Sequence, residues 1–164
     1  MKVIKNKKNS LGSEKTTYQY AYDSSLLASV PNKHASVDAW ASFLCTEFTS
    51  LCPKTGQPDF ARITINYIPG QNLLESKSLK LYLFSFRNHG DFHEDCIHKI
   101  CQDIVSIIGP KFIEVIGEFT PRGGITIYPY ASYAIDKQKY KNIYNQRFMG
   151  YTPGKYSMDF SRIY

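Results

Sequence analysis

No stretch of the chain approaches the roughly 20 consecutive apolar residues that a membrane-spanning helix needs. The sequence also lacks internal repeats, low-complexity segments and a Gly/Ser/Pro-rich linker that would divide it. The basic start is not followed by a long apolar stretch, so we expect no secretory signal and a cytoplasmic location. The 164 residues amount to one domain, large enough to bury a core.

The chain has little that resembles a metal-binding pattern. It contains four cysteines and four histidines, but no CxxC pair and no His pair with an established partner spacing. In a cytoplasmic chain, cysteines of this number are more often buried thiols, metal ligands or nucleophiles than disulfides. We therefore expect no metal site and treat the thiols as candidate nucleophiles or core residues.

Basic and aromatic side chains are plentiful. Lys and Arg number 20 against 14 Asp and Glu, which gives a net charge of +6, and aromatic residues make up 15% of the chain. Such a surplus suits an anionic partner, either nucleic acid or a phosphorylated small molecule. The aromatic rings could stack on bases or fill a core, so both classes remain open.

Hydrophobic periodicity predicts an α+β fold. Period-2 alternation and β-branched residues indicate strands at 37–49, 60–68, 112–120 and 125–133. Helical spacing indicates helices at 78–88, where the aromatic content would also suit a strand, and at 91–108. The order ββααββ favours an antiparallel sheet with the helices on one face. We assign residues 1–30 to a polar arm and 31–164 to a single domain, without predicting structure beyond residue 136.

Cys52 and Asp59 bracket a loop that contains two prolines and a glycine. A loop thiol beside a cation, here Lys54, can have a lowered pKa, and a thiolate is an effective nucleophile. An inert cysteine and a turn aspartate would account for the same residues, so neither position is specific alone.

Two basic segments could hold phosphates. Lys77 and Lys80 stand at the start of a predicted helix, where backbone N–H groups also attract anions. The Arg122-Gly123 turn would allow a ligand to approach the backbone closely. An exposed basic helix start and an ordinary turn would explain them equally well.

His93 and Glu94 stand side by side at the start of the second predicted helix. Asp91 and Glu94 have the spacing of a capping box, although Glu94 could instead accept hydrogen bonds from a ligand. As a histidine, His93 could donate a proton. Cys96 follows three residues later on nearly the same helix face.

These features occur together in one family. The segment 75–82, Glu-Ser-Lys-Ser-Leu-Lys-Leu-Tyr, resembles the signature of the NADPH-dependent 7-cyano-7-deazaguanine reductases, the nitrile reductases of the queuosine pathway. Segments 47–60 and 84–94 look like that family's catalytic loop and substrate segment. The resemblance runs from about residue 31 to about residue 133 and fits the short, single-domain form.

The resemblance implies a fold, a reaction and a set of roles. The fold is the tunnel fold, in which sheets of several subunits close into a barrel, here stacked pentamers forming a decamer, with active sites between subunits. The reaction reduces 7-cyano-7-deazaguanine with NADPH and involves no direct nucleic-acid contact. The resemblance makes Cys52 the nucleophile of a covalent thioimide and Asp59 the general acid, while His93 shapes the pocket or relays a proton. It assigns Leu74, Glu75, Ser76, His93 and Glu94 to the substrate, and Ser76, Lys77, Lys80, Arg122 and Gly123 to NADPH.

A further hypothesis concerns the thiol at position 96. If Cys96 approaches Cys52, the two could form a reversible disulfide that shields the nucleophile from oxidation. Two alternatives to the reductase remain at this point, namely a zinc-dependent GTP cyclohydrolase-like hydrolase on the same fold and an RNA-binding module.

Overall fold

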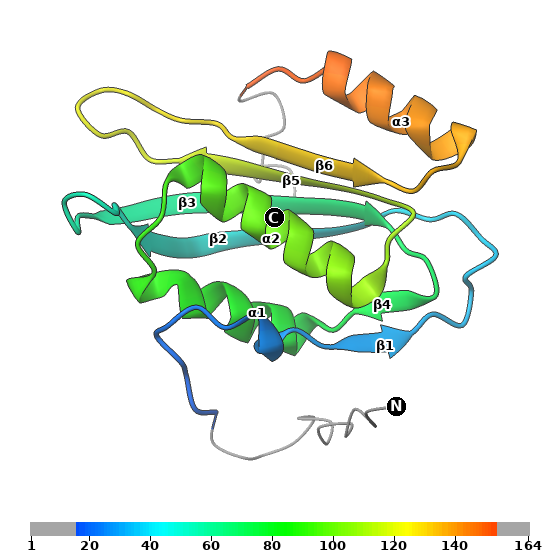
Figure 1. Ribbon diagram of the computed structural model, residues 1–164, viewed down its shortest axis with the longest axis horizontal. Coiled ribbons are helices and arrows are strands. Elements are labelled where there is room, and N and C mark those ends of the chain that lie inside the picture. Colours follow the sequence, from blue (N-terminus) through cyan, green and yellow to red (C-terminus); the bar gives the residue numbers. More distant parts are fainter. Residues whose placement is uncertain (1–15, 154–164) are drawn as a thin grey trace, which may run out of the picture.

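The computed structural model describes residues 16–153, which form an α+β domain (Figure 1). In chain order the elements are the short 3-10 helix η1 (Ser24–Leu26), β1 (Ser29–Pro31), β2 (Ala41–Leu51), β3 (Pro58–Ile68), β4 (Asn72–Leu74), α1 (Ser76–Ser85), the 3-10 helix η2 (Phe86–Asn88), α2 (His93–Ile108), β5 (Phe112–Phe119), β6 (Tyr130–Ala134) and α3 (Gln138–Met149). No helix of these residues is long and apolar enough to cross a membrane.

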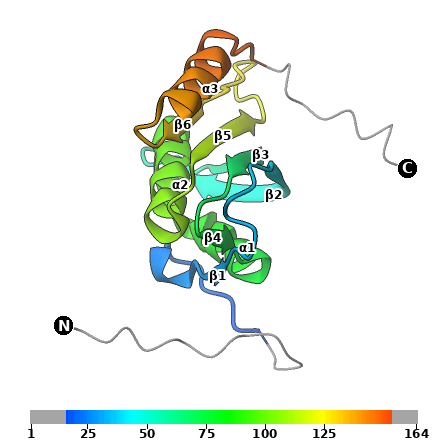
Figure 2. The same cartoon turned by 90° about the vertical axis from the view of Figure 1, so that its right-hand side faces the viewer.

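The main sheet is antiparallel and has the strand order β2-β3-β5-β6, while β1 and β4 pair in a small sheet of their own. Figures 1 and 2 place α2 across one face of the main sheet. α1 lies beside β2 on the same side, because Leu79 and Leu83 join the core that α2 shares with the strands. α3 packs along β6 at the edge of the sheet.

The core forms because the alternating residues of the strands and the helically spaced residues of α2 each place their apolar side chains on one face. Alternate residues of β3, such as Ile63 and Ile65, meet the isoleucines of α2 at positions 97, 100 and 104, and all are fully buried. Gly117 permits the close approach of α2 to β5, since a Cβ atom there would lie 2.9 Å from the side chain of Ile97. Burial of this apolar surface supplies the main driving force for the fold.

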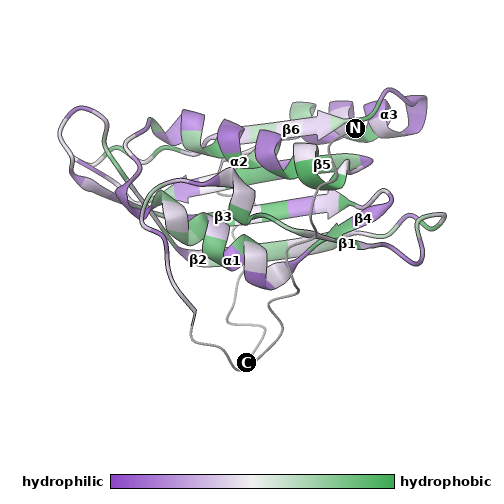
Figure 3. Ribbon diagram, turned by 60° about the horizontal axis from the view of Figure 1, so that its bottom comes forward, coloured by the Kyte–Doolittle hydropathy of each residue, from purple (hydrophilic) through white to green (hydrophobic). Residues whose placement is uncertain are grey.

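Several predictions of local structure need correction. The predicted helix at 78–88 is α1 followed by η2, so its helical spacing outweighed its aromatic content. The order ββααββ omits β1 and β4, and residues 125–129 precede β6 rather than belong to it. The helix α3 was not predicted; much of it is coloured as hydrophilic in Figure 3, so its hydrophobic pattern is weak.

The predicted N-terminal arm is only partly within the described residues, since positions 1–15 lie outside them. The remainder packs on the domain. The rings of Tyr18 and Tyr20 lie 4.5 and 5.2 Å from the ring of Phe84, and Leu27 is buried in the core. Residues 154–164, the end of the tail for which we predicted no structure, also lie outside the described residues.

Candidate active site

Three segments that are distant in the sequence converge at one end of the sheet (Figure 1). The β2–β3 loop with the start of β3 contributes Cys52 and Asp59, the start of α2 contributes His93, and the turn after β5 contributes Arg122. Arg122 and Ile125 exchange two backbone hydrogen bonds of 3.0 Å, which hold this turn closed. The nucleophile, the acid and the histidine predicted from the sequence therefore lie together.

The surroundings of the Cys52 thiol favour its thiolate form. The amide of Cys52 donates to the carbonyl of Gln57 and the amide of Gly56 donates back to Cys52, both at 2.9 Å, so the loop is a tight turn. Hydrogen bonds from the side chains of Thr55 and Arg122, together with backbone amides, lower the pKa of Cys52 to about 6. A thiol with this pKa is mostly thiolate at neutral pH.

The cation that acts on this thiol is not the one predicted from the sequence. Lys54 contributes only its backbone amide, whereas the side chain that reaches the sulfur is that of Arg122. The role of Thr55 was not predicted either. Its only signal in the sequence is that it lies in the same short loop as Cys52.

Asp59 is a buried carboxylate with one engaged oxygen and one available oxygen. Oδ1 lies 2.9 Å from Nε of Arg122. Oδ2 lies 3.1 Å from Nε2 of His93, but it makes no well-directed hydrogen bond to the described residues. The Asp59 side chain is only 3% exposed, and a buried polar atom without such a bond is costly unless a ligand or water engages it. Oδ2 is therefore suited to exchange a proton with a bound substrate.

His93 is held by stacking. Its ring lies flat on Phe119, with 4.0 Å between centroids and an interplanar angle of 17°. Its Nε2 also lies 3.4 Å from a terminal nitrogen of Arg122. Phe119, the last residue of β5, was not predicted as a site residue, because in the sequence it fits the alternation of an ordinary strand.

Glu94 is free to bind a ligand, because the predicted capping box is wrong. α2 begins at His93 with Phe92 as its N-cap residue, and no side chain caps it. Asp91 bonds to the amide of Phe92 and to Lys99 instead. Glu94 is exposed and has no hydrogen-bond or ion-pair partner among residues 16–153.

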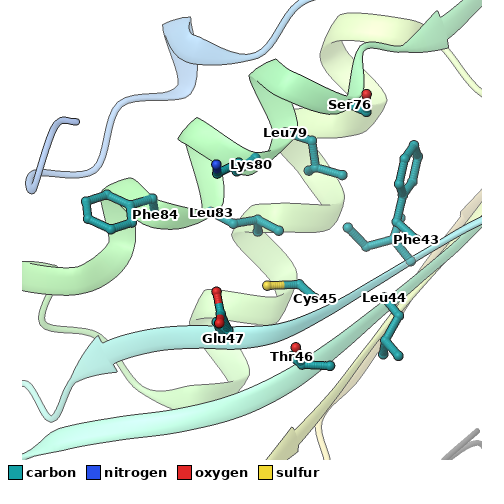
Figure 4. A pocket seen from close by; sticks show the side chains of 11 residues that line it. Phe43, Leu44, Cys45, Thr46, Glu47, Ser76, Leu79, Lys80, Leu83 and Phe84 are labelled. Carbon is teal, nitrogen blue, oxygen red and sulfur yellow. The ribbon is translucent and has the colours of Figure 1, made fainter. Parts of the chain in front are cut away.

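At the start of α1, the carboxylate of Glu75 acts as the cap. It accepts hydrogen bonds from the amides of Lys77 and Ser78 at 2.8 and 2.7 Å. Those amides are consequently occupied, and an anion there would be held by side chains rather than by the backbone. Ser76 and Lys80 line a pocket of about 300 Å³ between α1 and β2 (Figure 4).

The structure does not bring these α1 residues to Cys52. The end of α1 leads through η2 to Gly90, which bridges to Leu51 beside the nucleophile. A ten-residue helix rises about 15 Å. Ser76 and Lys77 therefore lie about one helix length from the cluster in the same chain. The side chain of Leu74 is buried in the core, so it could meet a ligand only through its backbone.

Comparisons with known proteins identify the family. The profile of the family described as QueF-like protein matches residues 58–138. The NADPH-dependent 7-cyano-7-deazaguanine reductase of Bdellovibrio bacteriovorus is 59% identical over 154 residues, which cover 94% of this chain and 91% of that protein. The protein of the same name from Bacillus subtilis is 55% identical over 86% of each chain.

This chain belongs to the family of NADPH-dependent 7-cyano-7-deazaguanine reductases. A solved structure, the archaeosine synthase QueF-Like in the apo form, has a TM-score of 0.51 at 18% identity and covers 58% of this chain and 91% of its own. At that identity the likeness concerns the fold alone. Because the chain belongs to the reductase family, the two alternatives considered from the sequence, a zinc-dependent hydrolase and an RNA-binding module, are set aside.

The remaining predicted residues of this reductase-family chain can also be placed. All four cysteines are free thiols, and burial raises the pKa of Cys96 to about 12. Ser50, near the end of β2, lies close to that thiol and precedes Cys52 by two residues, but its hydroxyl makes no well-directed hydrogen bond to the described residues. Within residues 16–153 no group of three or more His, Cys, Asp and Glu side chains could hold a metal ion.

Proposed function

We propose that this protein is a cytoplasmic, NADPH-dependent nitrile reductase that converts 7-cyano-7-deazaguanine to 7-aminomethyl-7-deazaguanine through Cys52. The observation that carries the proposal is the contact of Cys52 and Asp59 with one guanidinium, that of Arg122. A nitrile is a poor hydride acceptor, so the enzyme needs a nucleophile that converts it to a better one and an acid that protonates its nitrogen.

The covalent step uses groups that lie together in one chain. The thiolate of Cys52 attacks the nitrile carbon and forms a C–S bond, while one π bond of the nitrile breaks toward nitrogen. Asp59 transfers a proton to that nitrogen through Oδ2, which gives a neutral thioimide. His93 lies 3.1 Å from that oxygen and, when it is protonated, passes its own proton to Asp59, which restores the acid for the next step. Reduction and collapse then expel the Cys52 thiolate and leave an imine.

NADPH supplies one hydride in each of two reductions, first of the thioimide and then of the imine. The basic and hydroxyl side chains around the α1 pocket and the Arg122 turn suit a cofactor that carries phosphates. Lys80 and Ser76 are exposed beside the α1 pocket, and Gly123 has a φ of +56°, which glycine adopts readily in a turn open to solvent. We assign Ser76, Lys77, Lys80 and Gly123 to the cofactor, and Arg122 to both the cofactor and the thiolate.

The substrate is recognised by its guanine-like edge. A free carboxylate such as Glu94 can accept two hydrogen bonds from the ring N–H and the amino group of that edge. Glu94 adjoins His93, so a ligand held by Glu94 would reach the Cys52 cluster. Glu75 and Ser76 with the Leu74 backbone are the other proposed substrate contacts.

We further infer that a second subunit completes each site. The two predicted halves, the Cys52 cluster and the start of α1, are separated by about one helix length within a chain. A neighbouring chain that brings its α1 to the Cys52 cluster would unite them. The edge of β2 offers backbone groups for pairing between subunits, and the proposed assembly is a decamer of two stacked pentamers.

A reversible disulfide between Cys52 and Cys96 would protect the nucleophile. Peroxide oxidises the Cys52 thiolate to a sulfenic acid, and the Cys96 thiol then displaces water to form the disulfide. The position of Ser50 supports this pairing, because Ser50 is buried close to the Cys96 thiol and precedes Cys52 by only two residues.

The deciding experiment follows NADPH oxidation with 7-cyano-7-deazaguanine as substrate. We expect about two NADPH consumed per aminomethyl product, since a nitrile needs two hydrides to become an amine. Mass spectrometry of the quenched enzyme without NADPH should show an adduct on Cys52 that is absent in Cys52→Ala. Turnover by Cys52→Ser at the wild-type rate, or the absence of any adduct, would contradict the proposal.

A further inference from the structure

A compact polar cluster stands directly behind the nucleophile. Oδ2 of Asp91 lies 3.0 Å from Nζ of Lys99 and 3.1 Å from Nε2 of His89, and the Lys99 and His89 nitrogens are 3.2 Å apart. The three side chains thus form a closed triangle. Partial burial disfavours the charged form of Asp91, yet Lys99 and His89 together lower its pKa.

Tyr22 packs against one side of this triangle. The ring of Tyr22 from the N-terminal arm lies 4.9 Å from the Lys99 ammonium and 5.1 Å from the His89 ring. The Tyr22 hydroxyl donates to Asp103 at 2.6 Å, which fixes the ring against α2. We call His89, Asp91 and Lys99 the clamp, and Tyr22 packs against two of its three members.

The backbone of the clamp holds the residue before the nucleophile. The amide of Leu51 donates to the carbonyl of His89 at 2.9 Å, and the amide of Asp91 donates to the carbonyl of Leu51 at 3.1 Å. Between these bonds, Gly90 lies against the backbone of Pro53, since a Cβ atom on Gly90 would be 3.5 Å from the Cα atom of Pro53. Cys52 is thus flanked on both sides by residues that touch segment 89–91.

The same segment leads directly into the substrate side of the site. His93 begins α2 two residues after Asp91, and Glu94 follows it. Lys99, the third member of the clamp, lies on α2 itself, so the clamp ties this helix to the Cys52 loop. A reacting pair must be held within fractions of an ångström, and a displacement of 1 Å can cost about 100-fold in rate.

We propose that His89, Asp91 and Lys99 are positioning residues that set the distance between the Cys52 sulfur and a substrate bound at His93 and Glu94. They touch neither substrate nor cofactor and act through the Leu51 backbone. Their loss loosens the nucleophile without changing its protonation, because the groups that stabilise the thiolate are Thr55, Arg122 and local amides. This inference rests on the proposed attack by Cys52.

The test compares Asp91→Asn and Lys99→Met with the wild type. In both variants we expect faster hydrogen exchange at the amides of Leu51 and Asp91 and about 100-fold slower formation of the Cys52 adduct at saturating nitrile. The pH midpoint of Cys52 alkylation by iodoacetamide should stay at its wild-type value, which a general structural defect at the active site would not preserve. Lys141→Met is the matched control, because it removes an exposed ion pair with Asp136 far from the clamp in sequence.

Adduct formation at the wild-type rate in both variants would overturn the inference, as would a shifted alkylation midpoint. Should Asp91→Asn fail to fold, Lys99→Met still decides, because it leaves the Asp91–His89 contact in place. Failure of the proposed function would look different from failure of this inference, because the wild type itself would then form no adduct.

Discussion

The Nε atom of Arg122 lies 2.9 Å from Oδ1 of Asp59, and the same guanidinium reaches the Cys52 sulfur. One cation therefore contacts both the proposed nucleophile and the proposed acid. Since Arg122 is about one-third exposed while Asp59 is buried, the guanidinium also forms the boundary between the cluster and solvent. A cofactor phosphate that drew Arg122 outward would change the charge balance at both groups.

The pH dependence of Cys52 alkylation reports this arrangement. Because the pKa of Cys52 is lowered to about 6, the reactive thiolate is present above that pH and is lost as the pH falls through it. Reaction with iodoacetamide should rise to a plateau above pH 7. In Thr55→Val and in Arg122→Gln the midpoint should move upward, because each variant removes a hydrogen bond to the thiolate.

Lys54→Gln is the control for that experiment. The sequence suggests Lys54 as the activating cation, whereas the structure gives it only a backbone amide at the thiolate. Its side chain should therefore be replaceable without moving the midpoint. A midpoint that shifts in Lys54→Gln but not in Arg122→Gln would contradict the arrangement.

Much of the site was readable from sequence because it rests on local patterns. The loop between two alternating strands predicts that Cys52 and Asp59 lie near each other, and helical spacing predicts α2. Arg122 is 63 residues after Asp59, and nothing local indicates that its turn folds back onto Cys52. The capping box failed for a related reason, since Lys99, six residues after the start of α2, binds the Asp91 side chain instead.

Intersubunit completion of the site predicts complementation between inactive variants. Cys52→Ala removes one half of the site, and the double variant Lys77→Ala/Lys80→Ala removes the other. The two variants are mixed in equal amounts after reversible dissociation. If each site combines halves from different chains, about a quarter of the wild-type rate should return, because half of the sites receive an intact Cys52 and half of those also receive an intact α1. Rate measurements before and after mixing give the answer; no recovery in reassembled mixtures would place both halves in one chain.

Mild oxidation tests the disulfide. Treatment with a slight excess of hydrogen peroxide should abolish activity and link Cys52 to Cys96, and dithiothreitol should restore both. Burial holds the pKa of Cys96 at about 12, so Cys96 should resist alkylation while Cys52 reacts. In Cys96→Ala the same treatment should produce irreversible sulfinic acid at Cys52. Peptide mapping that pairs Cys52 with Cys45 or Cys101 would exclude the proposed partner.

The buried carboxylate of Glu114 predicts how α3 is attached. Glu114 is fully buried and pairs with Arg147 of α3, while Asn66 and Tyr130 donate to it at 2.9 and 3.0 Å. Arg147→Met would leave a buried negative charge without its cation and should cost about 3 kcal/mol of unfolding free energy. Adding Glu114→Gln should recover part of that loss, because the neutral amide needs no counter-ion. Urea unfolding of the single and double variants measures both effects, and an equal loss in the two would show that the charge is not responsible.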